Sequence, residues 1–196
     1  VDGVLLVTPY YNRPTAAGLV AHFETVLREV PLPTVLYNIP KRTGVDLDVS
    51  VLERLSALKH IVGIKEATGD ILRSQSIVAT FGSRFIVLSG DDGIVLGTLA
   101  VGGQGVISVT SNVAPDRVSK VVALWQEGKI EEARKLHFSL LPLHEALFLE
   151  SNPGPVKAAL GQLGKIFSEV RLPLVQPSPE TQERIRMALG KVGYRG

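Results

Sequence analysis

Lys65 and Tyr37 are the side chains of this sequence best suited to chemistry, because each lies at the end of a short apolar run. A lysine that is partly buried loses some of its preference for the charged form, and the resulting amine can attack a carbonyl carbon. A phenol beside it can carry protons during that attack. Each residue also has an ordinary explanation: a strand-end lysine that reaches solvent, and a tyrosine packed in the core.

Arg42 adds a third chemical group shortly after Tyr37, in the loop Pro40-Lys41-Arg42-Thr43-Gly44. A guanidinium can hold a carboxylate through two parallel hydrogen bonds, although a solvated loop arginine is an equally ordinary interpretation. The amine, the phenol and the guanidinium together favour a lysine that attacks the carbonyl carbon of a substrate bearing a carboxylate.

The candidates for a metal site are weaker. Asp91 and Asp92 resemble a pair of metal ligands, but they stand at the start of an expected helix, where carboxylates cap free N–H groups. The chain has no cysteine, and none of its four histidines lies at the catalytic end of an expected strand: His22, His60, His137 and His144. We therefore expect no metal ion and no cofactor.

The elements that must position these residues alternate between strand and helix. Five apolar runs rich in β-branched residues recur at even spacing, as is typical of strands buried in a parallel sheet: Val4–Thr8, Thr34–Asn38, Ile61–Lys65, Phe85–Ser89 and Val106–Val109. Helical periodicity fills the gaps between them. In the first gap Leu19, Val20, Phe23, Leu27 and Val30 share one face, and in the second Asp48 or Ser50 can cap a helix.

Two architectures suit this βα order, a doubly wound sheet and a (β/α)-barrel. The loop after the first run, Pro9-Tyr10-Tyr11-Asn12-Arg13-Pro14, lacks the glycines of a dinucleotide-binding turn, which favours the α/β TIM barrel. In a barrel the catalytic groups lie at the carboxyl ends of the strands, where Lys65 and Tyr37 fall. Alternation along Ile61–Lys65 places Ile61 and Gly63 on the same side as the lysine.

After Gly128 the strand pattern stops, and three helices are expected over Lys129–Leu149, Pro155–Leu163 and Pro179–Val192. We therefore predict two domains: residues 1–128 as the C-terminal portion of a barrel, and residues 129–196 as a helical region.

Composition narrows the function classes. The chain has 196 residues, of which 45% are hydrophobic and 20% charged, with a net charge of +2 and no basic stripe, so nucleic acid is not an expected partner. No apolar run approaches the ~18 residues of a membrane span, so no membrane partner is expected either. The lack of cysteine is consistent with a cytoplasmic protein.

Five motifs along the chain resemble the dihydrodipicolinate synthase family of pyruvate-dependent lyases, in the right order. They are the residues at 7–14 (VTPYYNRP), 37–44 (YNIPKRTG), 63–69 (GIKEATG), 88–92 (LSGDD) and 105–109 (GVISV). The resemblance implies the condensation of pyruvate with L-aspartate 4-semialdehyde in lysine and diaminopimelate biosynthesis. It also implies that Lys65 forms the imine, that Tyr37 carries protons and that Arg42 binds the semialdehyde's carboxylate.

The same resemblance implies further roles. Tyr11 would enter the site of a neighbouring subunit, and the backbone at Gly90 and Ile107 would line the pocket. The small-molecule substrates would be the only ligands, with no cofactor, and the subunits would form a homotetramer built from dimers. Of the family's lysine-inhibitor site only Tyr10 can be matched.

Two other functions stay open. A sugar-acid lyase, such as N-acetylneuraminate lyase or keto-deoxy-gluconate aldolase, resembles the same family but usually differs at the position of Arg42. A catalytically idle barrel that serves as a partner subunit is the alternative from another class. The five βα units correspond to strands four to eight of a barrel, so we expect about 95 residues to precede Val1, at roughly 30 residues per βα unit.

Overall fold

All strands found in residues 1–194, the part of the chain that the computed structural model describes, belong to one parallel sheet. Neighbouring strands follow the sequence order, as expected when each connection passes through a helix. The strands are β1 (Val4–Val7), β2 (Thr34–Asn38), β3 (Ile61–Glu66), β4 (Ile86–Ser89) and β5 (Gly105–Val106). The sheet belongs to the first of two units, which extends from Val1 to Ile107.

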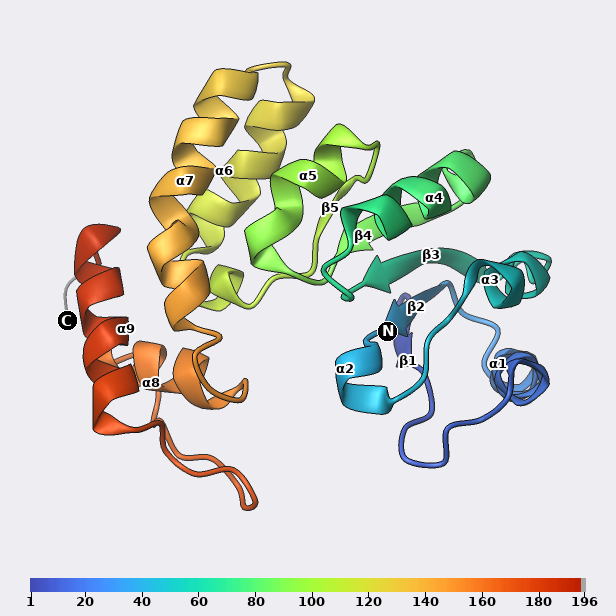
Figure 1. Ribbon diagram of the computed structural model, residues 1–196, viewed down its shortest axis with the longest axis horizontal. Coiled ribbons are helices and arrows are strands. Elements are labelled where there is room, and N and C mark those ends of the chain that lie inside the picture. Colours follow the sequence, from blue (N-terminus) through green and yellow to red (C-terminus); the bar gives the residue numbers. More distant parts are fainter. Residues whose placement is uncertain (195–196) are drawn as a thin grey trace. The chain divides into compact units, whose positions relative to one another are not determined.

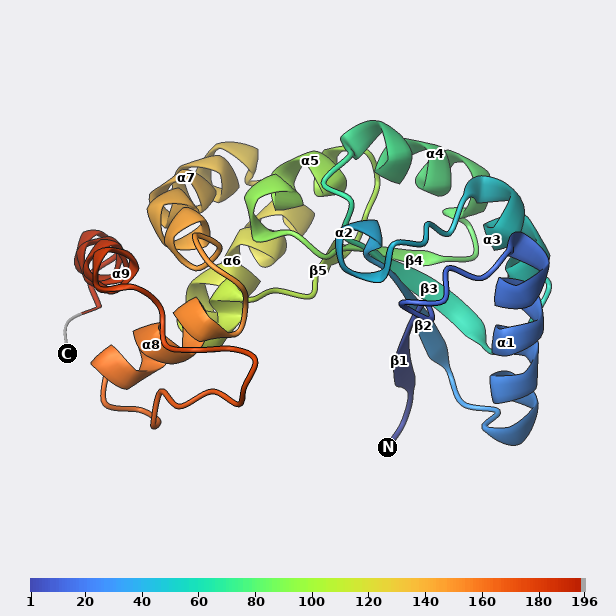
Figure 2. The same cartoon turned by 60° about the horizontal axis from the view of Figure 1, so that its bottom comes forward.

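The longer helices of the first unit lie along one side of this sheet: α1 (Ala16–Glu29), α3 (Val49–Ser56), α4 (Ile71–Phe81) and α5 (Val95–Ala100). The short helix α2 (Pro40–Thr43) follows the carboxyl end of β2, and a 3₁₀ turn, η1, spans Asp92–Ile94. Figure 2 shows α1, α3 and α4 along the same side of β2 and β3. The core lies between these layers, where Phe23 of α1, Leu36 of β2 and Leu52 of α3 are fully buried. Burial of each such side chain stabilises the fold by about 1.5–3 kcal/mol.

Helix α3 begins as the sequence predicts. Asp48 is the N-cap of α3, and its carboxylate accepts a hydrogen bond from the Val51 N–H at 2.9 Å. Ser50 instead donates its hydroxyl to Asp48 at 2.7 Å. A cap of this kind contributes about 1 kcal/mol to the stability of the fold and sets the residue at which α3 begins.

The second unit, which begins at Ser108, is helical. Its elements are a 3₁₀ turn, η2 (Thr110–Asn112), and the helices α6 (Pro115–Gln126), α7 (Ile130–Ala146), α8 (Gly154–Gln162) and α9 (Pro179–Lys191). Helix α7 packs against both α6 and α9, and α8 packs against α9 (Figure 1). Helix α6 thus belongs to the helical unit, whereas the sequence pattern changes only at residue 128. The division into domains at that residue stays a prediction.

Several predicted bounds were wrong in detail. The fifth strand was expected over Val106–Val109, but it ends at Val106 because the chain then turns: the Ser108 hydroxyl accepts a hydrogen bond from the Ser111 N–H at 2.7 Å. Val30 does not share the buried face of α1, because it is the C-cap and is 41% exposed. Among residues 1–194, none of the helices is both long and apolar enough to cross a membrane.

Candidate active site

Lys65 and Tyr37 lie side by side at the carboxyl ends of neighbouring strands. The register of β2 and β3 pairs Tyr37 with Lys65, and the Lys65 Nζ atom stands 3.9 Å from the centroid of the Tyr37 ring. At this separation an ammonium group is attracted by the negative face of the ring. The structure therefore brings together the two residues that the sequence predicts as nucleophile and proton carrier.

The strand that carries Lys65 depends on a glycine two residues earlier. A Cβ atom on Gly63 would lie 2.3 Å from the carbonyl oxygen of Ile86, so only glycine lets β4 approach β3 this closely. The prediction that Ile61 shares this side of the strand was wrong. The register shifts next to Ile61, between Thr34 and Val35 of β2, and Ile61 is buried in the helix-facing core together with Ile64.

Burial adjusts both groups toward their expected roles. It lowers the pKa of the Lys65 amine, an effect that the Arg42 charge reinforces and the Asp92 carboxylate opposes. Burial also raises the pKa of the Tyr37 phenol, against a smaller opposing effect from Arg42. At neutral pH a larger fraction of Lys65 is therefore present as free amine than for an ordinary lysine, while Tyr37 keeps its proton.

Gly90 lies directly against the lysine side chain. A Cβ atom at this position would stand 3.1 Å from the Lys65 Cε atom and 2.5 Å from the Cβ atom of Ala67. The Gly90 N–H donates to the carbonyl of Glu66 at 2.7 Å, which holds it beside the end of β3. A larger residue would therefore displace the Lys65 side chain or the strand end.

Arg42 lies on a short helix and not in a loop as predicted. Pro40 opens α2 at a position where its missing N–H has no cost, and Gly44 ends it in the left-handed conformation at φ 72°. The guanidinium charge acts on the pKa of both Tyr37 and Lys65, so the structure places Arg42 within electrostatic range of the pair.

Ile107 stands next to the carboxyl end of β4. Its N–H donates to the Ser89 carbonyl at 2.9 Å, which continues the ladder between β4 and β5 by one residue. Ile107 is partly buried and directly follows β5, just as Gly90 directly follows the neighbouring strand β4. Lining of a pocket by Ile107 and Gly90 stays a prediction.

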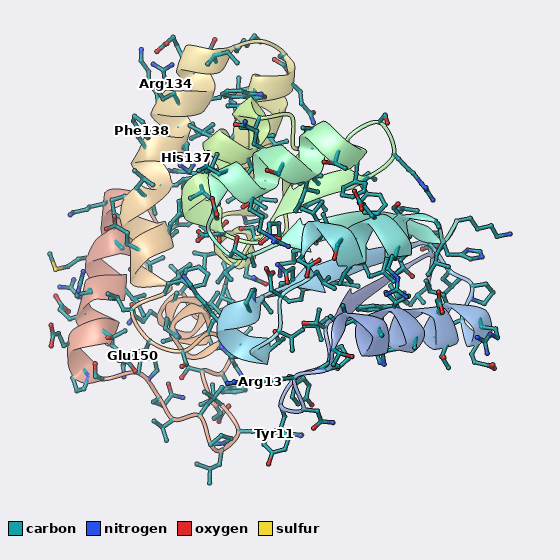
Figure 3. All side chains as sticks on the ribbon, turned by 45° about the vertical axis from the view of Figure 1, so that its right-hand side comes forward. Tyr11, Arg13, Arg134, His137, Phe138 and Glu150 are labelled. Carbon is teal, nitrogen blue, oxygen red and sulfur yellow. The ribbon has the colours of Figure 1, made fainter. Side chains whose placement is uncertain are left out.

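Tyr11 projects from the loop after β1 and does not pack on its own unit. It is 90% exposed, and its backbone is in the left-handed region with φ 70°, which is uncommon for a residue with a side chain (Figure 3). Tyr10 beside it is 70% exposed. The reach of Tyr11 into another subunit stays a prediction.

Sequence reasoning missed the buried carboxylate of Asp92. Asp91 does cap η1 as expected, through a hydrogen bond that its carboxylate accepts from the Gly93 N–H at 2.9 Å. Asp92, however, is only 2% exposed, and its charge acts on Lys65. The sequence alone does not show which of two adjacent acidic residues caps a helix and which one interacts electrostatically with Lys65, 27 positions earlier.

A second group of missed residues lies behind the strand ends. Glu66 follows Lys65 and is 2% exposed, yet its carboxylate pairs with Arg73 of α4, with Nε to Oε2 at 2.8 Å. Asn38 follows Tyr37, is fully buried, and donates to the same carboxylate at 3.0 Å. Alternation along the strands already places both residues on the side opposite Lys65 and Tyr37, which is the one signal that the sequence offers for them.

Comparison with known proteins agrees with this fold. The sequence model of the Dihydrodipicolinate synthetase family matches residues 1–192. The 4-hydroxy-tetrahydrodipicolinate synthase of Methanosarcina acetivorans is 47% identical over 194 residues, which are 98% of this chain and 67% of that protein. The enzyme of the same name from Geobacter sp. strain M21 is 53% identical over 173 residues, or 88% of this chain and 60% of that protein.

Solved structures give the same result. The 4-hydroxy-tetrahydrodipicolinate synthase of Methylacidiphilum fumariolicum SolV superposes with a TM-score of 0.96 at 48% identity, covering 98% of this chain and 64% of that one. The dihydrodipicolinate synthase of Thermotoga maritima gives 0.94 at 45%, covering 98% and 66%. The chain spans about two thirds of the length of these relatives. The predicted α/β TIM-barrel class is confirmed, and a chain matched along nearly its whole length by this family's sequence model belongs to the dihydrodipicolinate synthetase family.

Proposed function

We propose that this chain carries the catalytic lysine of a 4-hydroxy-tetrahydrodipicolinate synthase, a lyase that condenses pyruvate with L-aspartate 4-semialdehyde. The observation that carries the proposal is the Lys65 amine, which stands 3.9 Å above the Tyr37 ring and has a pKa lowered by burial. An amine at the end of a parallel strand, next to a phenol that keeps its proton, is suited to imine formation with a keto acid. The names of the relatives support this particular pair of substrates.

In the first step the Lys65 Nζ atom attacks the keto carbon of pyruvate. The carbonyl oxygen takes up one proton, which the nitrogen gives up, as the C–N bond forms, and a second proton lets it leave as water when the protonated imine is complete. We assign the delivery and recovery of these protons to Tyr37, the ionisable side chain whose ring lies beside the attacking amine. Loss of a proton from the methyl group then turns the imine into an enamine, whose terminal carbon is the nucleophile for the aldehyde.

In the second step Arg42 holds the carboxylate of the semialdehyde. Arg42 is exposed at the surface of α2, where a second substrate can reach it, and its charge acts on Lys65 and Tyr37. A bidentate contact of this kind fixes the orientation of the aldehyde against the enamine carbon. Gly90 and Ile107 are proposed to line the pocket through their backbone.

Borohydride trapping tests the proposal. Full-length protein incubated with pyruvate and borohydride should gain one carboxyethyl group on Lys65, identified by peptide mapping. Because burial lowers the pKa of the amine, the trapping rate should rise with pH and level off at a lower pH than for an ordinary lysine. Label on another lysine, or none, contradicts the proposal. Turnover of sialic acid in place of the semialdehyde would instead identify a sugar-acid lyase.

Replacement of Arg42 by alanine separates the two steps. Trapping of pyruvate should be nearly unchanged, whereas condensation with the semialdehyde should fall on the order of 10- to 100-fold, since a hydrogen bond to a charged group contributes about 1.5–3 kcal/mol. Both rates are measured on one preparation, with Lys41→Ala on the exposed surface of the same helix as the control. An equal loss in both steps would show that Arg42 does not act on the second substrate alone.

We further propose that Tyr11 completes the site of a second subunit in a cytoplasmic homotetramer. The exposed ring and the left-handed backbone at Tyr11 support a contact made outside its own unit. One solved relative, 45% identical over 98% of this chain, is described as a monomeric dihydrodipicolinate synthase variant, so the state of assembly needs its own measurement.

Mixing two impaired variants tests the role of Tyr11. In a symmetric dimer of one Lys65→Ala chain and one Tyr11→Phe chain, one of the two sites contains both native residues. An equimolar mixture refolded together should therefore recover about a quarter of wild-type activity, because roughly half of the dimers are mixed and each has one native site. Mass spectrometry of the intact assembly verifies the mixing. Fully mixed dimers without recovered activity would show that Tyr11 acts within its own subunit.

A further inference from the structure

A group of four polar side chains lies on the side of β2 and β3 that faces the helices, directly behind Tyr37 and Lys65. We call these side chains the clamp: Asn38, Asp46, Glu66 and Arg73. Asn38 and Glu66 pair in register one residue beyond the pair of Tyr37 and Lys65, so the two pairs project from opposite faces of the same strand ends.

Glu66 is the centre of the clamp. Its carboxylate accepts hydrogen bonds from Asn38 Nδ2 at 3.0 Å, from Arg73 Nε at 2.8 Å and from the backbone N–H of Thr68 at 2.8 Å. The Glu66 side chain is 1% exposed and that of Arg73 is 14% exposed. A buried carboxylate needs such a set of donors, because its oxygen lone pairs are shielded from water and can accept hydrogen bonds only from the protein.

The clamp also holds the segment that follows the Arg42 helix. Asp46 accepts from Asn38 Nδ2 at 2.8 Å and pairs with Arg73 at 3.1 Å. The backbone of Leu47 contacts the clamp twice, since its N–H donates to Asn38 Oδ1 at 3.0 Å and its carbonyl accepts from Arg73. The strand ends beneath Tyr37 and Lys65, the start of α4 and the segment after α2 are therefore joined by one hydrogen-bonded network.

We propose that Glu66 and Asn38 are positioning residues, which fix the two strand ends so that the Lys65 amine stays against the Tyr37 ring. The inference rests on the proposed function, because it concerns the geometry of imine formation. Neither residue touches the reacting atoms. A displacement of about 1 Å between two groups that must react lowers the rate on the order of 100-fold, so the strand ends must be held firmly.

A purely structural role for the clamp predicts different kinetics. A variant in which some chains no longer reach the folded state contains fewer competent molecules, so the final amount of label on Lys65 falls while the rate constant of the folded fraction is unchanged. A variant in which the strand ends move is fully labelled in the end, but slowly. Rate constant and final stoichiometry therefore separate the two explanations.

The test is Glu66→Gln in the full-length protein, assayed by borohydride trapping at saturating pyruvate. Glutamine keeps the volume of the side chain, but its amide nitrogen faces a donor in either orientation. In one orientation this donor is the Thr68 N–H, and in the other it is Asn38 Nδ2 and Arg73 Nε. The rate constant of imine formation should fall roughly 10- to 100-fold, with full final labelling and a half-saturating pyruvate concentration changed less than about threefold. The control Glu131→Gln, in an exposed pair with Arg134 at 3.0 Å, should behave as wild type.

Asp46→Asn keeps the inference testable if Glu66→Gln does not fold. The Asp46 side chain is 45% exposed, so its replacement is tolerated, and it should slow condensation with the semialdehyde more than imine formation, because it anchors the segment after Arg42. Wild-type rate constants in the folded variants would overturn the positioning role. Failure of the wild-type protein to label Lys65 would instead overturn the proposed function.

Discussion

Replacement of Lys65 by alanine is expected to abolish borohydride trapping and to lower turnover by a factor on the order of 10⁴ or more. Without the Lys65 amine no imine with pyruvate can form, because neither Tyr37 nor Arg42 can replace it as the nucleophile. The fold should persist, because burial already disfavours the charged form of Lys65 and the buried Glu66 carboxylate keeps its partner Arg73, although Asp92 loses the opposite charge of the lysine. The measurement is single-turnover labelling with pyruvate, together with steady-state condensation.

Lys65→Arg is the matched variant for this result. Arginine keeps a cation over the Tyr37 ring, so stability should be closer to wild type than in the alanine variant, yet its guanidinium stays protonated and does not attack the keto carbon. Both variants should therefore be equally inactive. Turnover that falls less than roughly tenfold in either one would mean that Lys65 is not the nucleophile.

Replacement of Tyr37 by phenylalanine should slow imine formation by about 10²–10⁴-fold, the usual contribution of a positioned acid–base group. Phenylalanine keeps the ring face over which the Lys65 Nζ atom lies, so the change removes the hydroxyl and leaves the packing. Because burial raises the pKa of Tyr37, the wild-type phenol stays protonated to a higher pH than an ordinary tyrosine. Its function as a proton donor should be lost only in strongly alkaline solution.

The measurement for Tyr37→Phe is the rate constant of labelling at saturating pyruvate, with the final stoichiometry as the check on folding. The rate should fall while one group per chain is still incorporated. Equal rates in the variant and the wild type would assign proton transfer to water or to another residue. A reduced final stoichiometry at an unchanged rate constant would indicate that some chains are not folded and that the proton transfer itself is unaffected.

The sequence predicted most closely those elements whose stability comes from local patterns. Thr34–Asn38 is an unbroken β-branched and apolar run, and it forms β2 over the predicted residues. Asp48 caps α3 because a carboxylate before an apolar periodic stretch satisfies a free N–H wherever the helix packs. Lys65 and Tyr37 meet because parallel strands place their carboxyl ends at one edge, which follows from the strand order alone.

What the sequence did not predict depends on tertiary contacts. The register shift opposite Ile61 moves that residue to the helix side, and no local pattern shows it. Arg73 lies seven residues after Glu66 and 27 after Asp46, so their pairing exists only once α4 has packed on the sheet. Asp92 reads as a helix-start carboxylate until the burial of its surroundings is known.

The stacking of Lys65 on Tyr37 gives the resting protein an intrinsic spectroscopic label. Nuclei that lie over the face of an aromatic ring are shielded by its π electrons, and the Lys65 Nζ atom is 3.9 Å from the ring centroid. The ¹⁵Nζ resonance of this one lysine should therefore appear upfield of the crowded lysine signals. A single selectively labelled spectrum would then report whether the amine and the phenol are assembled, before any substrate is added.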